Sequence, residues 1–153
     1  MRKEQFIRVN EDGSKYYHSD REMKKLHRED GPAIEWAGGT KDWYINDKLH
    51  REDGPAIEWA DGTKDWFIDD KRHREDGPAV EYANGDKSWY INGKLHREDG
   101  PAVEYANGDK SWYIDGRRLS EDEFNARMNP VELTLEDIAE KFGVSVEQLK
   151  IKK

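Results

Sequence analysis

The sequence predicts an all-β fold, a single-layer antiparallel stack of β-hairpin repeats that ends in a short α-helical C-terminal cap. Three observations support this fold class. A 23-residue unit occurs four times between residues 26 and 117, each copy contains two strand-like segments bounded by turn residues, and helix signals begin only after residue 117. The chain therefore divides into an N-terminal cap with a degenerate half-repeat (1–25), four repeats (26–117) and a helical C-terminal cap (118–153).

The four copies follow one another without an insertion. They are LHREDGPAIEWAGGTKDWYINDK (26–48), LHREDGPAIEWADGTKDWFIDDK (49–71), RHREDGPAVEYANGDKSWYINGK (72–94) and LHREDGPAVEYANGDKSWYIDGR (95–117). Upstream, EDGSKYYHSDREMKK matches a unit only in part, with Asp12-Gly13 at the internal turn and Tyr16-Tyr17 at the aromatic pair. It has three extra residues before His27, which indicates a cap.

Each copy has two turn signals. In the third copy, residues 79–83 and 87–91 alternate in polarity as strands do, and Asn84-Gly85 stands between them. This pair is typical of a two-residue type I′ turn, which needs a positive φ at both central positions. The equivalent pairs are Gly38-Gly39, Asp61-Gly62 and Asn107-Gly108. The second signal follows the second strand, as Asn46-Asp47, Asp69-Asp70, Asn92-Gly93 and Asp115-Gly116.

A type I′ turn at Asn84-Gly85 determines which side chains share a face. It places Val80 opposite Trp89, and the second turn then places Trp89 opposite His96. The predicted first face consists of Val80, Tyr82, Trp89, Ile91 and His96, and the second of Ala79, Glu81, Ser88, Tyr90 and Leu95. After the second hairpin, Gly-Pro ends the strand because proline cannot donate a ladder hydrogen bond and glycine permits a bend.

Composition favours a thin, elongated structure over a deep core. Only 34% of the residues are hydrophobic and 39% are charged, yet aromatic residues make up 11% and recur at fixed spacing. There is no cysteine, which excludes disulfides and thiol chemistry. The net charge of −8 argues against direct nucleic-acid binding, which depends on neutralising phosphates. A soluble protein is expected, because no run approaches the ~20 apolar residues of a membrane span and no secretory signal is evident.

No residue pattern indicates catalysis, a cofactor or a metal. The serines are scattered and none lies in a glycine-flanked elbow. Histidines of successive repeats are expected about 9.6 Å apart, two strand spacings, whereas zinc needs ligands that converge at about 2.0 Å. A structural role is therefore expected for the repeated histidines and the tryptophans opposite them, with each histidine packed on its tryptophan. These are His27, His50, His73 and His96, with Trp43, Trp66, Trp89 and Trp112.

The loop aspartates and the surface carboxylates receive separate predictions. The loop carboxylates Asp30, Asp53, Asp76 and Asp99 are expected to accept hydrogen bonds from backbone amides. One glutamate per repeat forms a column on the face opposite the tryptophans, with arginines nearby; this is either a solvated, mutually neutralising face or a surface for a partner. The candidate partner-binding residues are Glu35, Glu58, Glu81, Glu104, Arg51, Arg74, Tyr44, Tyr90 and Tyr113.

The repeat resembles a known family. The order W-Y-x-N-G-K-x-H, a glycine and an aromatic strand ending in A-[DN]-G resembles the 23-residue MORN repeat over residues 12–117, and is clearest at Trp89, Asn92, Gly93, Lys94, His96, Gly100, Tyr105, Asn107 and Gly108. The chain departs from it by inserting Arg-Glu-Asp before Gly-Pro. This H-R-E-D-G-P-A variant is similar to a group of repeat proteins common in bacteriophage and bacterial genomes. The resemblance implies stacked hairpins used for protein contacts and, less often, lipid contacts.

The C-terminal segment carries helix signals. Ser120 and Glu123 form a capping-box pattern, and Asn129-Pro130 ends that helix. Thr134 is expected to cap a second helix that ends at Gly143. A third short turn is expected from Ser145 with Gln148 to Ile151. The fragment LEDIAEKFGVSVEQL resembles part of a helix-turn-helix or of a LysM module; the preferred interpretation is a cap over the last hairpin.

These observations predict a non-enzymatic repeat scaffold for protein–protein interaction. The resemblance implies a phage accessory protein that binds or inhibits a host protein in the host cytoplasm. The alternatives are an acidic mimic that blocks a nucleic-acid-binding site and a peripheral membrane module. Self-association through the sheet ends or the aromatic face is also left open. Because every repeated residue occurs four times, a unique position is expected at the irregular ends, around Tyr16–His18 or in 119–153.

Overall fold

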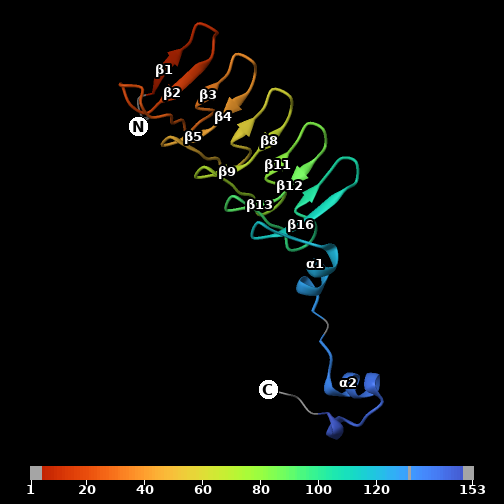
Figure 1. Ribbon diagram of the computed structural model, residues 1–153. Helices are drawn as coiled ribbons and strands as arrows, with labels where there is room; N and C mark the ends of the chain where they lie inside the picture. The colour runs from red at the N-terminus through yellow and green to blue at the C-terminus, as the bar shows by residue number, and fades with distance from the viewer. Residues whose placement is uncertain (1–4, 131, 150–153) are drawn as a thin grey trace. The chain divides into compact units, whose positions relative to one another are not determined.

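The computed structural model describes residues 5–130 and 132–149. The chain forms two compact units, Met1–Ser120 and Glu121–Lys153, which are considered separately. The first unit is an antiparallel sheet of 11 strands built from successive hairpins, which confirms the predicted all-β stack. The hairpins lie in a single row with their first turns on the same side (Figure 1).

The long sheet contains the first hairpin of every repeat. Its order is β1 (Phe6–Val9), β2 (Lys15–His18), β3 (Ile34–Glu35), β4 (Lys41–Asp42), β7 (Ile57–Glu58), β8 (Lys64–Asp65), β11 (Val80–Glu81), β12 (Lys87–Ser88), β15 (Val103–Glu104), β16 (Lys110–Ile114) and β17 (Arg117–Leu119). The second hairpins of the first three repeats form separate two-stranded ribbons: β5 (Tyr44–Ile45) with β6 (Lys48–Leu49), β9 (Phe67–Ile68) with β10 (Lys71–Arg72), and β13 (Tyr90–Ile91) with β14 (Lys94–Leu95).

The first turn of each repeat is not the predicted type I′ turn. In the third repeat the Tyr82 amide donates to the Asp86 carbonyl at 3.0 Å, and the Gly85 amide donates to the Tyr82 carbonyl at 2.9 Å. Of the three loop residues between them, only Gly85 has a positive φ, of 93°. This is the three-residue hairpin loop, a type I turn followed by one left-handed glycine. An Asn-Gly pair fits both geometries, so the dipeptide alone did not distinguish them.

The extra loop residue shifts the register by one position. Val80 pairs with Ser88 and Glu81 with Lys87, whereas the predicted register paired Val80 with Trp89. A shift of one residue moves a side chain to the opposite face, because strand side chains alternate. The predicted composition of the two faces is therefore wrong for the first hairpin: Val80 and Ser88 lie on the same face, and Glu81 lies on the other.

The second turn does have the predicted type I′ geometry. Asn92 and Gly93 have φ values of 50° and 80°. The flanking strands pair Ile91 with Lys94, and the ladder continues with a hydrogen bond of 3.1 Å from the His96 amide to the Trp89 carbonyl. Trp89 and His96 are thus cross-strand neighbours, as the sequence indicated.

Backbone hydrogen bonds join each repeat to the next. The Trp66 amide donates to the Ala79 carbonyl at 2.8 Å, and the His73 amide donates to the Trp66 carbonyl at 3.1 Å. Ala79 and its equivalents in the other repeats are completely buried. The space between the loop and the preceding repeat holds a methyl group, which explains the alanine after Gly-Pro.

Large apolar side chains contribute little to the buried interior. In the first unit it consists of four alanines, of Tyr17, Ile34, Val80, Val103, Ile114 and Leu119, and of the buried polar residues Ser14, His18, Asp42, Asp65, Ser88 and Ser111. The array therefore depends on backbone ladders and on buried polar side chains more than a globular domain of this length would.

The second unit is helical, as predicted. It contains α1 (Glu121–Met128), α2 (Leu135–Phe142) and a 3₁₀ turn, η1 (Val146–Gln148). Thr134 caps α2 through a reciprocal capping box with Asp137, and Gly143 ends it with φ of 64°. The expected end of the third turn at Ile151 lies outside the described residues, and the capping role of this unit stays a prediction. None of the helices in the described parts of the chain is long and apolar enough to cross a membrane.

The first turn yields a matched pair of substitutions. We expect Gly39→Ala to lower the free energy of unfolding by about 1–2 kcal/mol, because alanine resists a left-handed conformation. The φ of Gly39 is 95°, and an added Cβ would make only an ordinary 3.7 Å contact with Ala60. The neighbouring Gly38→Ala should be neutral or stabilise the protein by up to about 1 kcal/mol, since Gly38 has no positive φ and its Cβ position is open. Urea unfolding of the two variants measures the difference, and equal effects would contradict the turn assignment.

Candidate functional site

One arginine in each repeat holds the His-Arg-Glu-Asp-Gly-Pro loop in place. In the second repeat, Arg51 Nε donates to Asp53 Oδ1 at 2.9 Å, and Nη1 donates to the Pro55 carbonyl and to Glu58 Oε1, both at 3.2 Å. The guanidinium carbon lies 4.3 Å from the centroid of the Trp43 ring, a cation–π distance. We call this arrangement the arginine clamp. It recurs at Arg28, Arg74 and Arg97.

The glycine of the loop leaves space for this guanidinium. A Cβ added to Gly54 would lie 2.8 Å from Arg51 Cζ, closer than atoms pack. Gly54 has no positive φ, so its role is close approach and not the bend that the sequence suggested. The spacing of arginine and glycine in H-R-E-D-G is thus explained by one contact.

The clamp corrects the prediction for the loop aspartate. The Asp53 carboxylate has Arg51 as its main partner, and this hydrogen bond, followed by the arginine charge, lowers the pKa of Asp53 below 3.8. Backbone amides were predicted instead. The ring of Trp43 also stacks with Arg51, a contact that the sequence did not predict, and the packing of His50 on this ring stays a prediction.

Each histidine of the repeats contacts the second turn of its own repeat. His96 Nδ1 accepts a hydrogen bond of 3.1 Å from the amide of Asp115, in the second turn of the same repeat, while His73 Nδ1 accepts one of 3.2 Å from the amide of Asn92. The other ring nitrogen, Nε2, faces a glutamate of the same loop and lies 3.6 Å from Glu98 Oε1 in the case of His96. These contacts hold each loop against its own second hairpin, so they agree with a structural role. Among the described residues, no three His, Cys, Asp or Glu side chains form a group that could hold a metal.

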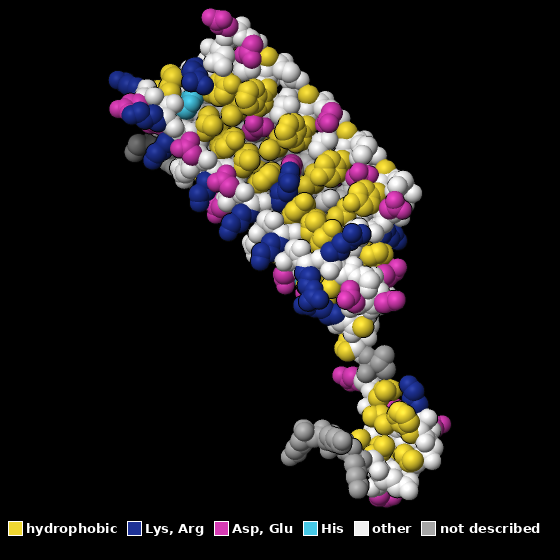
Figure 2. Space-filling view, viewed as in Figure 1, with side chains coloured by type: hydrophobic (Ala, Val, Ile, Leu, Met, Phe, Trp, Pro, Cys, Tyr) yellow, Lys and Arg dark blue, Asp and Glu magenta, His cyan; other side chains and the backbone are white. Residues whose placement is uncertain are grey.

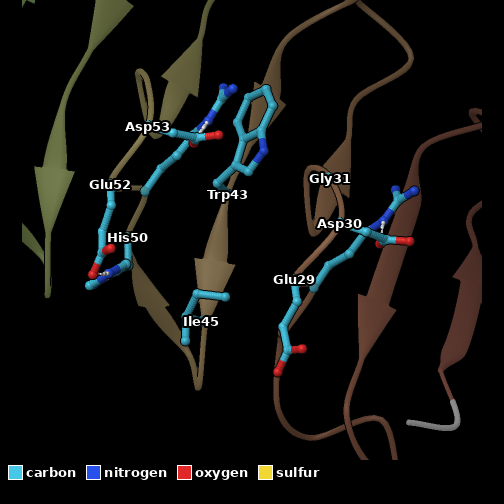
Figure 3. Close-up of a pocket in the computed structure, with 10 residues that line it drawn as sticks. Glu29, Asp30, Gly31, Trp43, Ile45, His50, Glu52 and Asp53 are labelled. Carbon is cyan, nitrogen blue, oxygen red and sulfur yellow. Dashed lines mark hydrogen bonds and ion pairs between the residues drawn. The ribbon is translucent and has the colours of Figure 1, made fainter. Parts of the chain in front are cut away.

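A shallow groove separates successive loops on the face that carries the clamps. The groove between the first two loops has a volume of about 630 Å³ and is lined by Arg28–Gly31, Trp43, Ile45 and His50–Asp53 (Figure 3). A similar groove of about 610 Å³ lies between the third and fourth loops. Glu52 and Asp53 at the rim are both 86% exposed. The clamp face is therefore polar, and its charges are largely paired within each repeat.

The candidate partner-binding residues are divided between the two faces of the sheet. Glu58 accepts from the arginine stacked on Trp43, so the glutamate column lies on the tryptophan face and not opposite it. Its members Glu35, Glu58, Glu81 and Glu104 are each held by a clamp arginine. Arg51 and Arg74 are clamp residues themselves. The candidates Tyr44 and Tyr90 lie on the other face, beside Asp42 and Arg72 respectively, and Tyr113 holds the equivalent position in the fourth repeat.

The opposite face exposes aromatic rings along the whole array. One column consists of Trp36, Trp59, Tyr82 and Tyr105, which are 40–46% exposed. A second, half-buried column consists of Tyr44, Phe67, Tyr90 and Tyr113. We call these two columns the aromatic face. Hydrophobic side chains gather in a broad band along this side of the array in the space-filling view, with acidic and basic side chains among them (Figure 2).

A buried ion pair between the second and third repeats interrupts this band. The side chain of Asp65 is 3% exposed and accepts from Arg72 Nε at 3.0 Å and from Arg72 Nη2 at 2.8 Å. The guanidinium lies 5.5 Å from the ring centroids of Phe67 and Tyr90. The hydrogen bond to Asp65 raises the pKa of Arg72. The other repeats have leucine at the position of Arg72, namely Leu26, Leu49 and Leu95.

The equivalent carboxylate one repeat earlier has a different environment. Asp42 is 8% exposed and accepts a hydrogen bond of 2.7 Å from Trp36 Nε1. Burial raises the pKa of Asp42 above 3.8, and the bond from Trp36 offsets this only in part. Repeats three and four have Ser88 and Ser111 at this position. The array itself therefore contains unique positions, whereas the sequence analysis expected them at the ends. Aligning the repeats shows the Asp-Asp-Ser-Ser and Leu-Leu-Arg-Leu columns, which are the signal that could have located them.

No protein-family model matches the chain, and no curated protein is significantly similar to it. The likeness to the MORN repeat therefore remains a resemblance of the residues in 12–117.

The two buried aspartates predict opposite effects of removing a charge. The pKa of Asp42 is raised by folding, so its contribution to stability is complete below pH 3.8 and is lost as pH rises through the folded pKa. Asp42→Asn should therefore raise the free energy of unfolding at pH 7 relative to the parent, and the gain should disappear at acidic pH. Asp65→Asn should lower it by about 2 kcal/mol at pH 7, because Arg72 loses its anion in a partly buried site. Denaturant unfolding at pH 3 and pH 7 measures both, and destabilisation by Asp42→Asn at pH 7 would contradict this account.

The clamp predicts that Arg51 and Gly54 are energetically coupled. Gly54→Ala should destabilise the protein by about 1–3 kcal/mol, because the methyl group displaces the guanidinium. In an Arg51→Ala background the same change should cost nothing or stabilise slightly, since the space is then free. A double-mutant cycle measured by urea unfolding gives the coupling. Additive effects would show that the clamp is not the reason for glycine.

Proposed function

We propose that this protein is a non-catalytic repeat scaffold that binds another protein through its aromatic face. The observation that supports the proposal is the exposed row of large aromatic side chains along one side of the sheet. A monomeric soluble protein rarely exposes a continuous apolar patch of this kind unless something binds it. Tryptophan and tyrosine are also the residues most enriched at the energetic centres of protein interfaces.

The rigidity of the array supports the same proposal. Every repeat is tied to the next by backbone hydrogen bonds, and its loop is held by a clamp. Each exposed ring belongs to a residue that directly follows a strand and whose amide closes the first turn by a backbone hydrogen bond. The backbone that carries the rings is thus already ordered, so binding costs little conformational entropy. The repeat length places equivalent rings about 9.6 Å apart, two strand spacings. A partner would thus meet a regular, preorganised surface.

The charges favour a partner that is neutral or basic. Residues 26–117 contain 13 Lys and Arg against 21 Asp and Glu, which accounts for the whole net charge of −8. Such an array repels phosphate backbones and anionic membrane surfaces. The clamp carboxylates occupy equivalent, arginine-paired positions, unlike the unequal carboxyl pair that acid–base catalysis uses.

Affinity capture tests the proposal with two matched double variants. The immobilised full chain is exposed to a bacterial extract, the source that the repeat resemblance implies. We expect the parent chain to capture a protein in stoichiometric amount. The Trp59→Gln, Tyr82→Gln variant should capture at least about tenfold less of that protein, because it lacks two interface aromatics. The Glu52→Gln, Glu75→Gln variant alters the clamp face and should retain the protein. Circular dichroism confirms that both variants are folded. No specific partner, or equal retention by both variants, would contradict the proposal.

A further inference from the structure

The third repeat shows how the aromatic face accommodates a guanidinium. Arg72 binds Asp65 through two nitrogen–oxygen contacts of 2.8 and 3.0 Å and lies between the rings of Phe67 and Tyr90. Its side chain is still 39% exposed, whereas that of Asp65 is 3% exposed. The guanidinium therefore covers a buried carboxylate from the solvent side. An arginine of another protein could make the same contacts with a buried carboxylate and two rings.

The preceding repeat has the same elements without the arginine. Asp42 corresponds to Asp65, and the flanking rings are Tyr44 and Phe67. Leu49 stands in place of Arg72 and pairs with Tyr44 across the ribbon, so it also lies on the aromatic face. Among the residues that the structure describes, the contact that Asp42 makes is the hydrogen bond from Trp36, and no cationic side chain reaches it.

The energetics of Asp42 favour a cation. A carboxylate that is more than nine-tenths buried loses hydration that a single indole hydrogen bond does not replace. Burial raises the pKa of this group accordingly. A partner-borne cation that binds here restores the lost interaction, as Arg72 does at Asp65. The acidic balance of the repeats attracts the same kind of group.

The geometry selects arginine over lysine. A planar guanidinium can donate to both carboxylate oxygens and stack against aromatic rings at the same time, whereas an ammonium is a strongly hydrated point charge. Leu49 adds an apolar surface for the methylene stem. From these contacts we infer that Asp42, with Tyr44 and Phe67, is a socket for an arginine side chain of the bound protein. This inference rests on the proposed function, because it takes the aromatic face as the docking surface.

The socket would also set the register of the partner. A surface that repeats every 23 residues offers several equivalent docking positions. Ser88 and Ser111 replace the carboxylate in repeats three and four, and Arg72 already occupies Asp65. Asp42 is thus the carboxylate at this repeat position that an external arginine can reach in the array. One charged contact of this kind distinguishes one alignment from the others.

The socket is tested with N-acetyl-arginine methylamide on the full-length, nitrogen-15-labelled protein. The Trp36 indole N–H donates to Asp42 and reports on it directly. We expect a saturable shift of this resonance at millimolar arginine amide, and at least a tenfold weaker response to the citrulline amide, which is neutral. Asp42→Asn should abolish the response. An equal response to citrulline, or a Trp36 resonance that does not move, would overturn the inference.

A pair of leucine substitutions provides an internal control. Leu49→Arg supplies the guanidinium from within, so the variant should no longer respond to arginine amide and should unfold at higher denaturant concentration than the parent. Leu95→Arg places the same residue beside Ser88, where no carboxylate is available, and should leave the Trp36 response unchanged. If both variants behave alike, Asp42 is not the reason for binding.

The socket and the docking surface can fail separately. If Asp42→Asn retains the captured protein as well as the parent while Trp59→Gln, Tyr82→Gln loses it, the socket is wrong and the proposed function stands. If arginine amide binds at Asp42 but the captured protein is insensitive to the aromatic substitutions, the docking surface is wrong.

Discussion

The arginine clamp is the interaction on which the rest of this structure depends. In each repeat one guanidinium holds a loop aspartate, a proline carbonyl and a strand glutamate, and stacks on an aromatic ring of the preceding unit, which for Arg51 is Trp43. These contacts position the loop so that the alanine after Gly-Pro is buried and its carbonyl accepts a hydrogen bond from the preceding unit. In a chain with few large buried side chains, such polar contacts supply part of the stabilisation that an apolar core usually provides.

The clamp also explains why the two faces of the sheet differ. It concentrates arginines and carboxylates on one face, where they neutralise one another within each repeat. The opposite face is left with aromatic rings, two buried aspartates and Arg72. Repetition makes that face large, and the two aspartates make the first two repeats different from the last two, which have serine at the same position. Extent favours affinity for a partner and irregularity favours one alignment, so the two properties complement each other on a repetitive scaffold.

A single extra loop residue had a large effect on the predicted site. The pair Asn84-Gly85 is compatible with a two-residue turn and with a three-residue loop, because both require a glycine at positive φ. The three-residue loop lets β12 pair with β15 of the next repeat through Lys87 opposite Glu104. That choice moves Glu81 to the face of the clamps and separates the glutamate column from the tyrosines. The preference arises from pairing between repeats, which lies outside the dipeptide.

The sequence by itself determined the features that depend on local chemistry. The 23-residue period, the type I′ turn at Asn92-Gly93, the strand segments and the caps of α2 all follow from short-range conformational preferences. Only the tertiary structure decided which residues share a face, why Gly54 must be glycine, and that Asp42 and Asp65 are buried in different surroundings. These features depend on how side chains meet in three dimensions: Arg51 folds back on its own loop, whereas Trp36 with Asp42 and Asp65 with Arg72 meet across neighbouring strands. One residue of register would exchange the neighbours of the strand residues.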